Sequence, residues 1–291
     1  MPMEIITDES TELIHAGFHW REHEGVRALV CAPLEKEGFA NAFSTRLGGV
    51  SPMPQDALNL AGFNEDKAEN IYENRRRFLK LFDGDWMLTG CWQMHSADIR
   101  TVSGREDARR DTENFDAMIT NASRILLGVK TADCVPIILG DARSGACAAV
   151  HAGWRGTLDS IAARAVGRMT TEYGTRARDL RAAIGPAARG CCYEVGAEVI
   201  EAFRKNFKQS GDLFTPTQNG HALVDLQRAN REQLIESGIE PERIHSVPLC
   251  TMCRTDLFFS YRREKSLYGR TGRLMSVIGR RDTGHRTQDL G

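Results

Sequence analysis

The sequence predicts a single domain that mixes helices and strands, and three observations carry this prediction. The chain has 291 residues, of which 41% are hydrophobic and 26% charged, as in ordinary globular proteins. Continuous apolar runs of strand length recur between residues 125 and 150, whereas residues 66–82 repeat apolar side chains about every 3.6 residues. A mixed chain of this length can close around one extended core, and no linker or internal repeat divides the sequence.

The first 25 residues are expected to form an N-terminal extension. Three histidines, His15, His19 and His23, would share one helix face there, but Gly17 and Gly25 weaken such a helix. A solvated segment is therefore favoured over a metal site.

The catalytic domain is expected to span residues 26–280. Residues 26–32 and 39–43 are apolar runs short enough to predict strands. Residues 44–52 are rich in turn-forming residues and predict a loop. The apolar positions of residues 66–82 fit one face of a helix.

Strands and helices alternate along the rest of the domain. Three apolar runs without polar alternation follow at 125–129, 135–139 and 147–150, which is typical of strands covered on both faces. Asp225 is a plausible N-cap for one of the later helices. We expect helices at 157–173, 196–207 and 224–237, and strands at 180–184, 243–247 and 274–278. Residues 281–291 are polar and are expected to form a frayed tail.

Charge and hydropathy exclude several classes of partner. The formal net charge is −1 and the pI is about 6.7, so no global field would gather nucleic acid or an anionic membrane. No apolar run approaches the ~18 residues of a membrane span, and residues 1–4 lack the basic and apolar regions of a secretion signal. We therefore expect a cytoplasmic protein. In a reducing compartment its eight cysteines would more often be metal ligands or nucleophiles than disulfides.

Three residues near predicted strands are candidates for chemistry. Cys134 precedes the run at 135–139, His151 ends the run at 147–150, and His95 follows an apolar stretch. Together they would provide the three ligands that a catalytic zinc needs when its fourth position stays open. Copper suits the same donors. Without a metal, Cys134 would act as a nucleophile with His151 as its base, and ordinary core packing is a further alternative for either residue.

The remaining cysteine motifs are weaker signals. Cys250 and Cys253 form a C-x-x-C, but Cys191 and Cys192 are adjacent rather than spaced as in a zinc ribbon, so a structural zinc is not favoured. The sequence has no zinc-deaminase signature and no P-loop, dinucleotide-binding or hydrolase-elbow motif. The arginine-rich stretch at 261–273 is equally consistent with a phosphate-binding site and with a solvated surface.

Taken together, the motifs resemble one family, the purine nucleoside phosphorylases formerly described as laccase-domain or polyphenol oxidase proteins. They lie in order from about residue 39 to residue 280, which is nearly the whole chain. The matching segments are FSTRLGGVS (43–51), LNL (58–60), NR (74–75), QMHS (93–96), FDAM (115–118), TADCVP (131–136), HAGWRG (151–156), IGP (184–186), CCYEVG (191–196), VDL (224–226), AN (229–230), CTMC (250–253) and FFSYR (258–262).

The resemblance implies a single α+β domain whose mixed β-sheets form a sandwich-like core flanked by helices. It also implies that His95, Cys134 and His151 hold a zinc ion, with copper binding reported for the family as well. The implied reactions are phosphorolysis of adenosine, inosine, guanosine and methylthioadenosine to base and ribose 1-phosphate, with adenosine deamination as a second activity. Purine nucleosides and inorganic phosphate would be the partners of a monomer or weak homo-oligomer.

Copper-dependent phenol oxidation is also reported for the family, but the histidine pattern does not favour it. A multicopper oxidase builds its cluster from H-x-H pairs, and none of the eight histidines forms one. The chain also departs from the family pattern. Ala187 follows Ile-Gly-Pro where the family usually has Cys, and Met94 stands where Val is commoner. Neither residue is a proposed ligand, but the substituted loop bears on substrate preference.

Further site residues are assigned from their positions. Asp133 is the acid/base candidate nearest in sequence, and its place beside Cys134 slightly favours a role in orienting an imidazole ligand. Arg46 and Arg155 lie in glycine-bearing loops and are the candidates for a phosphate site. Asn59 is expected to contact substrate.

Overall fold

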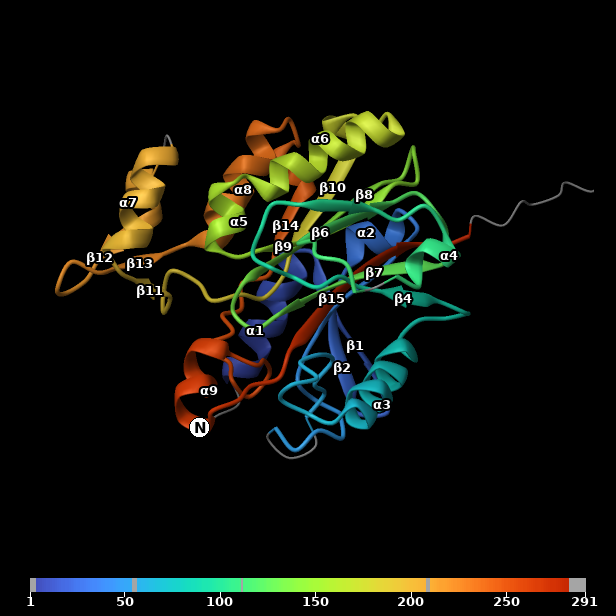
Figure 1. The fold of residues 1–291 in the computed structure, drawn as a ribbon, viewed down its shortest axis with the longest axis horizontal. Coiled ribbons are helices and arrows are strands. Elements are labelled where there is room, and N and C mark those ends of the chain that lie inside the picture. Colours follow the sequence, from blue (N-terminus) through green and yellow to red (C-terminus); the bar gives the residue numbers. More distant parts are fainter. Residues whose placement is uncertain (1–3, 54–56, 111, 208–209, 283–291) are drawn as a thin grey trace, which may run out of the picture.

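The computed structural model describes residues 4–53, 57–110, 112–207 and 210–282, and its centre is two six-stranded sheets (Figure 1). The first sheet is antiparallel except at its last pair of strands, β7 and β4. Its strands, in sheet order, are β1 (Phe18–His23), β2 (Val26–Cys31), β3 (Phe39–Ser44), β15 (Leu274–Arg280), β7 (Ile125–Thr131) and β4 (Met87–Thr89).

The second sheet is mixed, with antiparallel pairs at its centre and one parallel pair at each edge. In sheet order its strands are β14 (Ile244–Ser246), β10 (Leu180–Ile184), β8 (Val135–Asp141), β9 (Cys147–Ala152), β6 (Ala117–Thr120) and β5 (Ile99–Thr101). A small third sheet lies toward one end of the molecule (Figure 1) and consists of β11 (Glu194–Val195), β13 (Ala222–Val224) and β12 (Phe214–Pro216).

The two large sheets face each other across a common core. Strands β7 and β15 of the first sheet contact β8 and β9 of the second. The side chains between them are fully buried and apolar, and include Phe39, Phe43, Leu127, Val129, Ile138, Ala149 and Ile278. The sandwich-like core implied by the motif resemblance is therefore confirmed.

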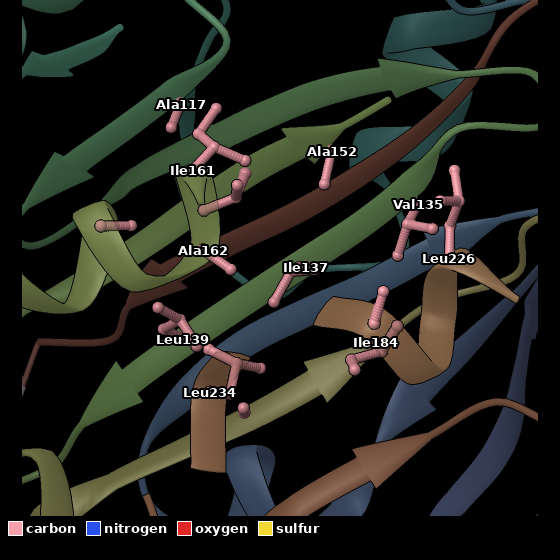
Figure 2. Packing of buried hydrophobic residues seen from close by; sticks show 14 of the residues in the cluster. Ala117, Val135, Ile137, Leu139, Ala152, Ile161, Ala162, Ile184, Leu226 and Leu234 are labelled. Carbon is pink, nitrogen blue, oxygen red and sulfur yellow. The ribbon is translucent and has the colours of Figure 1, made fainter. Parts of the chain in front are cut away.

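Helices cover the outer faces of both sheets. Helix α3 (Ala68–Leu79) packs Phe78 onto the first sheet. The second sheet is covered by α5 (Trp154–Leu158), α6 (Ile161–Tyr173) and α8 (Leu226–Glu236). Figure 2 shows this layer, with residues of α6 and α8 beside those of the sheet: Ile161, Ala162, Leu226 and Leu234 against Val135, Ile137, Leu139 and Ile184.

Both faces of the central strands are thus occupied, which explains the continuous apolar runs in the sequence. On β8, Ile137 and Leu139 face the helices while Ile138 faces the other sheet. On β9, Ala148 and Ala149 divide in the same way. Since successive side chains of a strand point to opposite faces, a strand between two apolar layers has no position for a polar residue.

The remaining helices lie at the edges of the two sheets or in their connections. They are α1 (Glu4–His15), α2 (Ala32–Lys36), α4 (Arg105–Ala108), α7 (Ala197–Asn206) and α9 (Tyr261–Tyr268), with short 3₁₀ turns at Ala177–Asp179, Ser210–Leu213 and Pro241–Arg243. None of the helices in the described ranges has the length and hydropathy of a membrane span.

The structure contains elements that the sequence analysis did not predict. The segment of His19 and His23, for which a solvated extension was favoured, is strand β1, which pairs with β2 along its whole length. The short strands β4, β5 and β6 were not predicted either. The helix expected at 157–173 is two helices, because Ser160 adopts a left-handed conformation with φ of 58° between α5 and α6. Most of the polar tail expected at 281–291 lies outside the described residues.

Candidate metal centre

Two neighbouring strands position Cys134 and His151. Cys134 ends the turn that leads into β8, and His151 lies on β9 opposite Pro136. The loop between β4 and β5 brings His95 to the same place. One ligand atom from each of the three residues lies within 4.8 Å of the other two. The structure therefore brings together the three residues expected to form a metal site.

Asp116, which precedes β6, holds this arrangement in place. Its carboxylate accepts hydrogen bonds from the backbone N–H groups of Met94, His95 and Ser96 at 2.7–3.0 Å. His95 itself has a positive φ of 61°, so the loop adopts a tight conformation around the carboxylate. The backbone of His95 is thus held by a carboxylate 21 residues further along the chain.

Asp116 also orients the second histidine. The Nδ1 atom of His151 lies 2.7 Å from Asp116 Oδ1, and the backbone N–H of His151 donates to the Asp116 carbonyl at 2.8 Å. A protonated Nδ1 leaves Nε2 as the metal-binding atom, which is the usual arrangement of a carboxylate behind a histidine ligand. The sequence analysis did not assign a role to this residue. Its signals are its place in the matching segment FDAM (115–118) and its position directly before an apolar strand.

The charges of the three groups are strongly coupled. Burial opposes ionisation of the Cys134 thiol, but the charges of His151 and His95 and their hydrogen bonds outweigh it and lower its pKa to about 6. Burial likewise disfavours the His151 imidazolium, yet Cys134 and Asp116 raise its pKa to about 9. Without a metal, the site thus favours a thiolate beside an imidazolium.

The donor set and the space around it fit a zinc ion. Two imidazoles and one thiolate form a three-ligand set of the kind that keeps a fourth position open. Gly153 leaves room for them, because a Cβ atom there would meet His95 Cδ2 at 3.0 Å and Cys134 Sγ at 3.3 Å. The same donors also suit copper.

The three residues line a cavity of about 910 Å³. Large aromatic side chains that remain exposed to solvent gather in it: Phe63, Tyr72, Trp92 and Tyr261. Arginines also line it, including Arg155, Arg262 and Arg273. The guanidinium of Arg155 lies 4.2 Å from the centroid of Trp154, and that of Arg262 lies 5.2 Å from Tyr193. Stacking surfaces and cations therefore surround the three metal-binding candidates.

Asp133 lines the same cavity but contacts other groups than expected. Its carboxylate accepts hydrogen bonds from Thr251 Oγ1 at 2.7 Å, Ser260 Oγ at 3.0 Å and the backbone N–H of Arg262 at 2.7 Å. Burial raises the pKa of Asp133, although these hydrogen bonds oppose the change. The carboxylate that contacts the imidazole of His151 is therefore that of Asp116 and not that of Asp133.

Of the three residues expected to bind substrate, one lines the cavity and the other two are buried elsewhere in the fold. Arg155 lines the cavity, but Arg46 does not. Arg46 is buried and pairs with Glu264 at 2.6 Å, so its charge is already neutralised within the fold. Asn59 is also fully buried, where it donates to Asp66 and accepts from the backbone of Arg273. The structure does not bring Arg46 or Asn59 to the metal centre.

Comparison with known proteins identifies the class of this fold and site. Residues 40–281 match the model of the family described as multi-copper polyphenol oxidoreductase laccase, and the chain belongs to this family. The resemblance drawn from the motifs is thereby confirmed.

Individual relatives are similar over most of their length. Purine nucleoside phosphorylase YlmD of Geobacillus stearothermophilus is 33% identical over 267 residues, which is 87% of this chain and 94% of YlmD. Adenosine deaminase RL5, from an unknown prokaryotic organism, is 35% identical over 253 residues, which is 82% of this chain and 96% of RL5. The crystal structure of Bacillus licheniformis hypothetical protein YfiH has a TM-score of 0.82 at 30% identity, covering 90% of this chain and 99% of that one.

Proposed function

We propose that this protein is a purine nucleoside phosphorylase that acts on adenosine, inosine, guanosine and methylthioadenosine in the cytoplasm, with adenosine deamination as a second activity. The observation that carries the proposal is the convergence of His95, Cys134 and His151 in a cavity lined by exposed aromatic and cationic side chains. The names of relatives such as YlmD and RL5 support the choice of nucleosides as substrates.

His95, Cys134 and His151 would hold a zinc ion. When bound, zinc would supply Lewis-acid chemistry to the cavity and activate water for deamination. The chain itself contributes the orientation of the ligands, since Asp116 fixes both the His95 loop and the His151 ring. Rigid support of this kind is what a reaction at one defined atom requires.

Phosphorolysis places further demands on the cavity. A phosphate oxygen forms a bond to C1′ as the bond from C1′ to the purine nitrogen breaks, and the departing base takes up the proton that the attacking hydrogen phosphate loses. Arg155 is suited to bind the phosphate, because a guanidinium pairs with its oxygens through two parallel hydrogen bonds. The exposed rings of Phe63, Tyr72, Trp92 and Tyr261 offer apolar faces for a purine.

Asp133 would serve in positioning. Both of its oxygens already accept hydrogen bonds, including one from the backbone of Arg262 in the cavity wall. We therefore assign it the task of holding the backbone of Arg262 in the cavity wall; the guanidinium of Arg262 donates to the Glu194 carbonyl at 2.8 Å. Replacement of Asp133 by Asn would then disturb the cavity wall and raise the KM for the nucleoside more than it lowers kcat, whereas loss of a proton-transfer group would lower kcat.

The central test is chromatography of the products that zinc-loaded protein makes from adenosine, with and without inorganic phosphate. Without phosphate we expect inosine as the product. With phosphate we expect adenine and ribose 1-phosphate, together with hypoxanthine from phosphorolysis of the inosine formed. Arg155→Met should raise the KM for phosphate by about 10-fold or more. Arg168→Met serves as the control, because Arg168 lies on α6 outside the cavity and pairs with Glu172. No conversion of any purine nucleoside by the loaded protein would overturn the proposal.

Cys134→Ala should abolish zinc binding and all turnover while the protein stays folded, because it removes one of three ligands from a half-buried position. Zinc content, circular dichroism and product formation measure the three parts of this prediction. Full activity with normal zinc content would refute the ligand assignment.

A metal-independent cysteine hydrolase is the second candidate, and the coupled charges of Cys134 and His151 favour it. It predicts inactivation by an alkylating agent and no effect of a chelator. It also predicts that His95→Ala retains activity, whereas the zinc enzyme loses it.

Copper-dependent phenol oxidation has less support from the donor groups. Among the residues that the structure describes, the other metal-binding candidate group is four cysteines and contains no histidine. Copper-loaded protein tested with a phenol and dioxygen decides this point, and we expect no oxidation above that of free copper.

A further inference from the structure

Four cysteines from two distant segments meet outside the cavity. Cys191 and Cys192 lie between β10 and β11, and Cys250 and Cys253 lie between β14 and α9. All four sulfur atoms lie within 4.8 Å of one another. Cys253 Sγ is 3.1 Å from Cys192 Sγ and 3.7 Å from Cys191 Sγ.

The backbone brings these segments together. Ala187 and Cys250 form a parallel β-bridge, and the N–H of Thr251 donates to the Ala187 carbonyl at 3.0 Å. The adjacent pair occupies a turn, in which the N–H of Cys192 donates to the Arg189 carbonyl at 2.9 Å. The convergence thus follows from hydrogen-bonded backbone.

The arrangement differs from ordinary cysteine packing. Buried cysteines usually fill core space singly, as Cys31 and Cys147 do here. In the cluster, Cys191 and Cys253 are exposed, and all four residues are free thiols. A tetrahedral zinc–sulfur bond of about 2.3 Å implies sulfur–sulfur separations of roughly 3.8 Å. The Cys191–Cys253 separation of 3.7 Å agrees with this value, and the Cys192–Cys253 separation of 3.1 Å would have to lengthen on binding.

We propose that Cys191, Cys192, Cys250 and Cys253 bind a second zinc ion in a structural tetrathiolate site, separate from the His95, Cys134 and His151 centre. Four protein ligands leave no open position, which is the pattern of a structural zinc. The side chain of Arg263 contacts Cys192 and offsets part of the negative charge of such a complex.

The second site would join two loops that build the wall of the cavity. Tyr193 directly follows Cys192 and lines the cavity. Thr251 lies between the other two cysteines and donates a hydrogen bond to Asp133 at 2.7 Å. A metal held by these cysteines would therefore fix the position of one cavity side chain and of the residue that supports Asp133.

Metal content per chain tests the proposal on the full-length protein, purified under reducing conditions and loaded with zinc. We expect two zinc ions in the unaltered protein, one in Cys253→Ser and one in His95→Ala. Cys31→Ala is the matched control, because Cys31 is a buried core cysteine outside both groups, and it should retain two. A single zinc in the unaltered protein that Cys253→Ser leaves in place would overturn the proposal.

Cobalt substitution distinguishes the two sites and is independent of nucleoside turnover. Cys134→Ala, which removes the sulfur ligand of the first site, should show sulfur-to-cobalt charge-transfer absorption and the visible bands of a tetrahedral thiolate complex when loaded with Co²⁺. This variant decides the matter alone if Cys253→Ser fails to fold. Absence of those bands, or a Cys192–Cys253 disulfide in the mass spectrum of the reduced preparation, would exclude the tetrathiolate site.

Discussion

Asp116 is the residue that combines structure and chemistry most closely. It is fully buried, and its hydrogen bonds tie a loop to a strand. Burial opposes its ionisation, but hydrogen bonds from His151 and from the backbone of Ser96 and Met94, together with the charge of His151, lower its pKa to about 2. The carboxylate is therefore ionised throughout the physiological range.

Asp116→Asn should weaken zinc binding by about 10–100-fold, the usual loss when the carboxylate behind a histidine ligand is removed. The metal-free protein should also lose about 1–3 kcal/mol of stability, because buried donors are left with one acceptor fewer. Chelator competition and thermal unfolding measure the two effects. Asp98→Asn is the control, since Asp98 is exposed in the same loop region. Equal zinc affinity in both variants would contradict the assigned role.

Gly153 gives a second residue-scale prediction. Its φ of −72° suits any residue, so Gly153→Ala should fold normally. The added methyl group would push His95 or Cys134 from its position, and kcat/KM should fall by about 10–100-fold. Gly167→Ala is the matched control. Gly167 is exposed on α6 with no atom within 4 Å of an added Cβ, and the change should add roughly 0.5–1 kcal/mol of stability without altering kcat/KM.

Among the secondary-structure elements, short α4 depends on one carboxylate. Asp107 accepts hydrogen bonds from the backbone of Ser103 and from the side chains of Arg100 and Arg110, at 2.7–2.9 Å. The Ser103 hydrogen bond and the two guanidinium groups lower its pKa to about 2. Arg100 lies on β5 and is nearly buried, so this cluster anchors α4 to the edge of the second sheet.

The pH dependence of this contribution follows from the direction of the shift. The folded-state pKa of Asp107 lies below the unfolded value of about 3.9, so its stabilisation is present above about pH 4 and is lost as the pH falls through 2. Asp107→Asn should lower Tm at pH 6 by about 2–4 °C, and the difference should shrink toward pH 2. Calorimetry at several pH values checks this. Asp85→Asn, at an exposed ion pair, should change Tm little at any pH.

The strength of the apolar pattern decided which elements could be predicted. Strands β7, β8 and β9 were expected from their apolar runs, and Asp225 does cap α8 by accepting from the N–H of Arg228. Strands β4, β5 and β6 have three or four residues, too few to establish a period. Strand β1 was missed because its sequence is mostly polar and its face is only partly buried.

In the candidate site, too, residues marked by a strong local sequence pattern could be predicted, and residues defined by distant partners could not. Cys134 and His151 could be predicted, because each is a reactive residue at the end of a strong strand signal. The role of Asp116 could not, since its partners at 94–96 come from a distant loop. Arg46 illustrates the converse error. Its place in a glycine-bearing loop suggested an anion site. In the structure its guanidinium instead donates a hydrogen bond to the carboxylate of Glu264, which lies 218 residues further along the chain.

For the molecule as a whole, stability should depend on the core shared by the two sheets. Ile138 of β8 is fully buried between them. Ile138→Ala should cost about 2–5 kcal/mol, because the neighbouring strands cannot collapse into the space left. Chemical denaturation measures the loss. Ile14→Ala, at a position 67% exposed on α1, should change stability by less than about 0.5 kcal/mol. Similar costs at the two positions would contradict a tightly packed interface between the sheets.

The backbone constrains His151 and Cys134 more strongly than it constrains His95. His151 lies inside β9, and Cys134 is followed at once by β8, so neither can move without breaking strand pairs. His95 is exposed on a loop that Asp116 holds by hydrogen bonds. We therefore expect an ion to enter and leave by way of His95. Its residence time would then be set by how often residues 93–96 open, and the rest of the molecule would stay folded throughout the exchange.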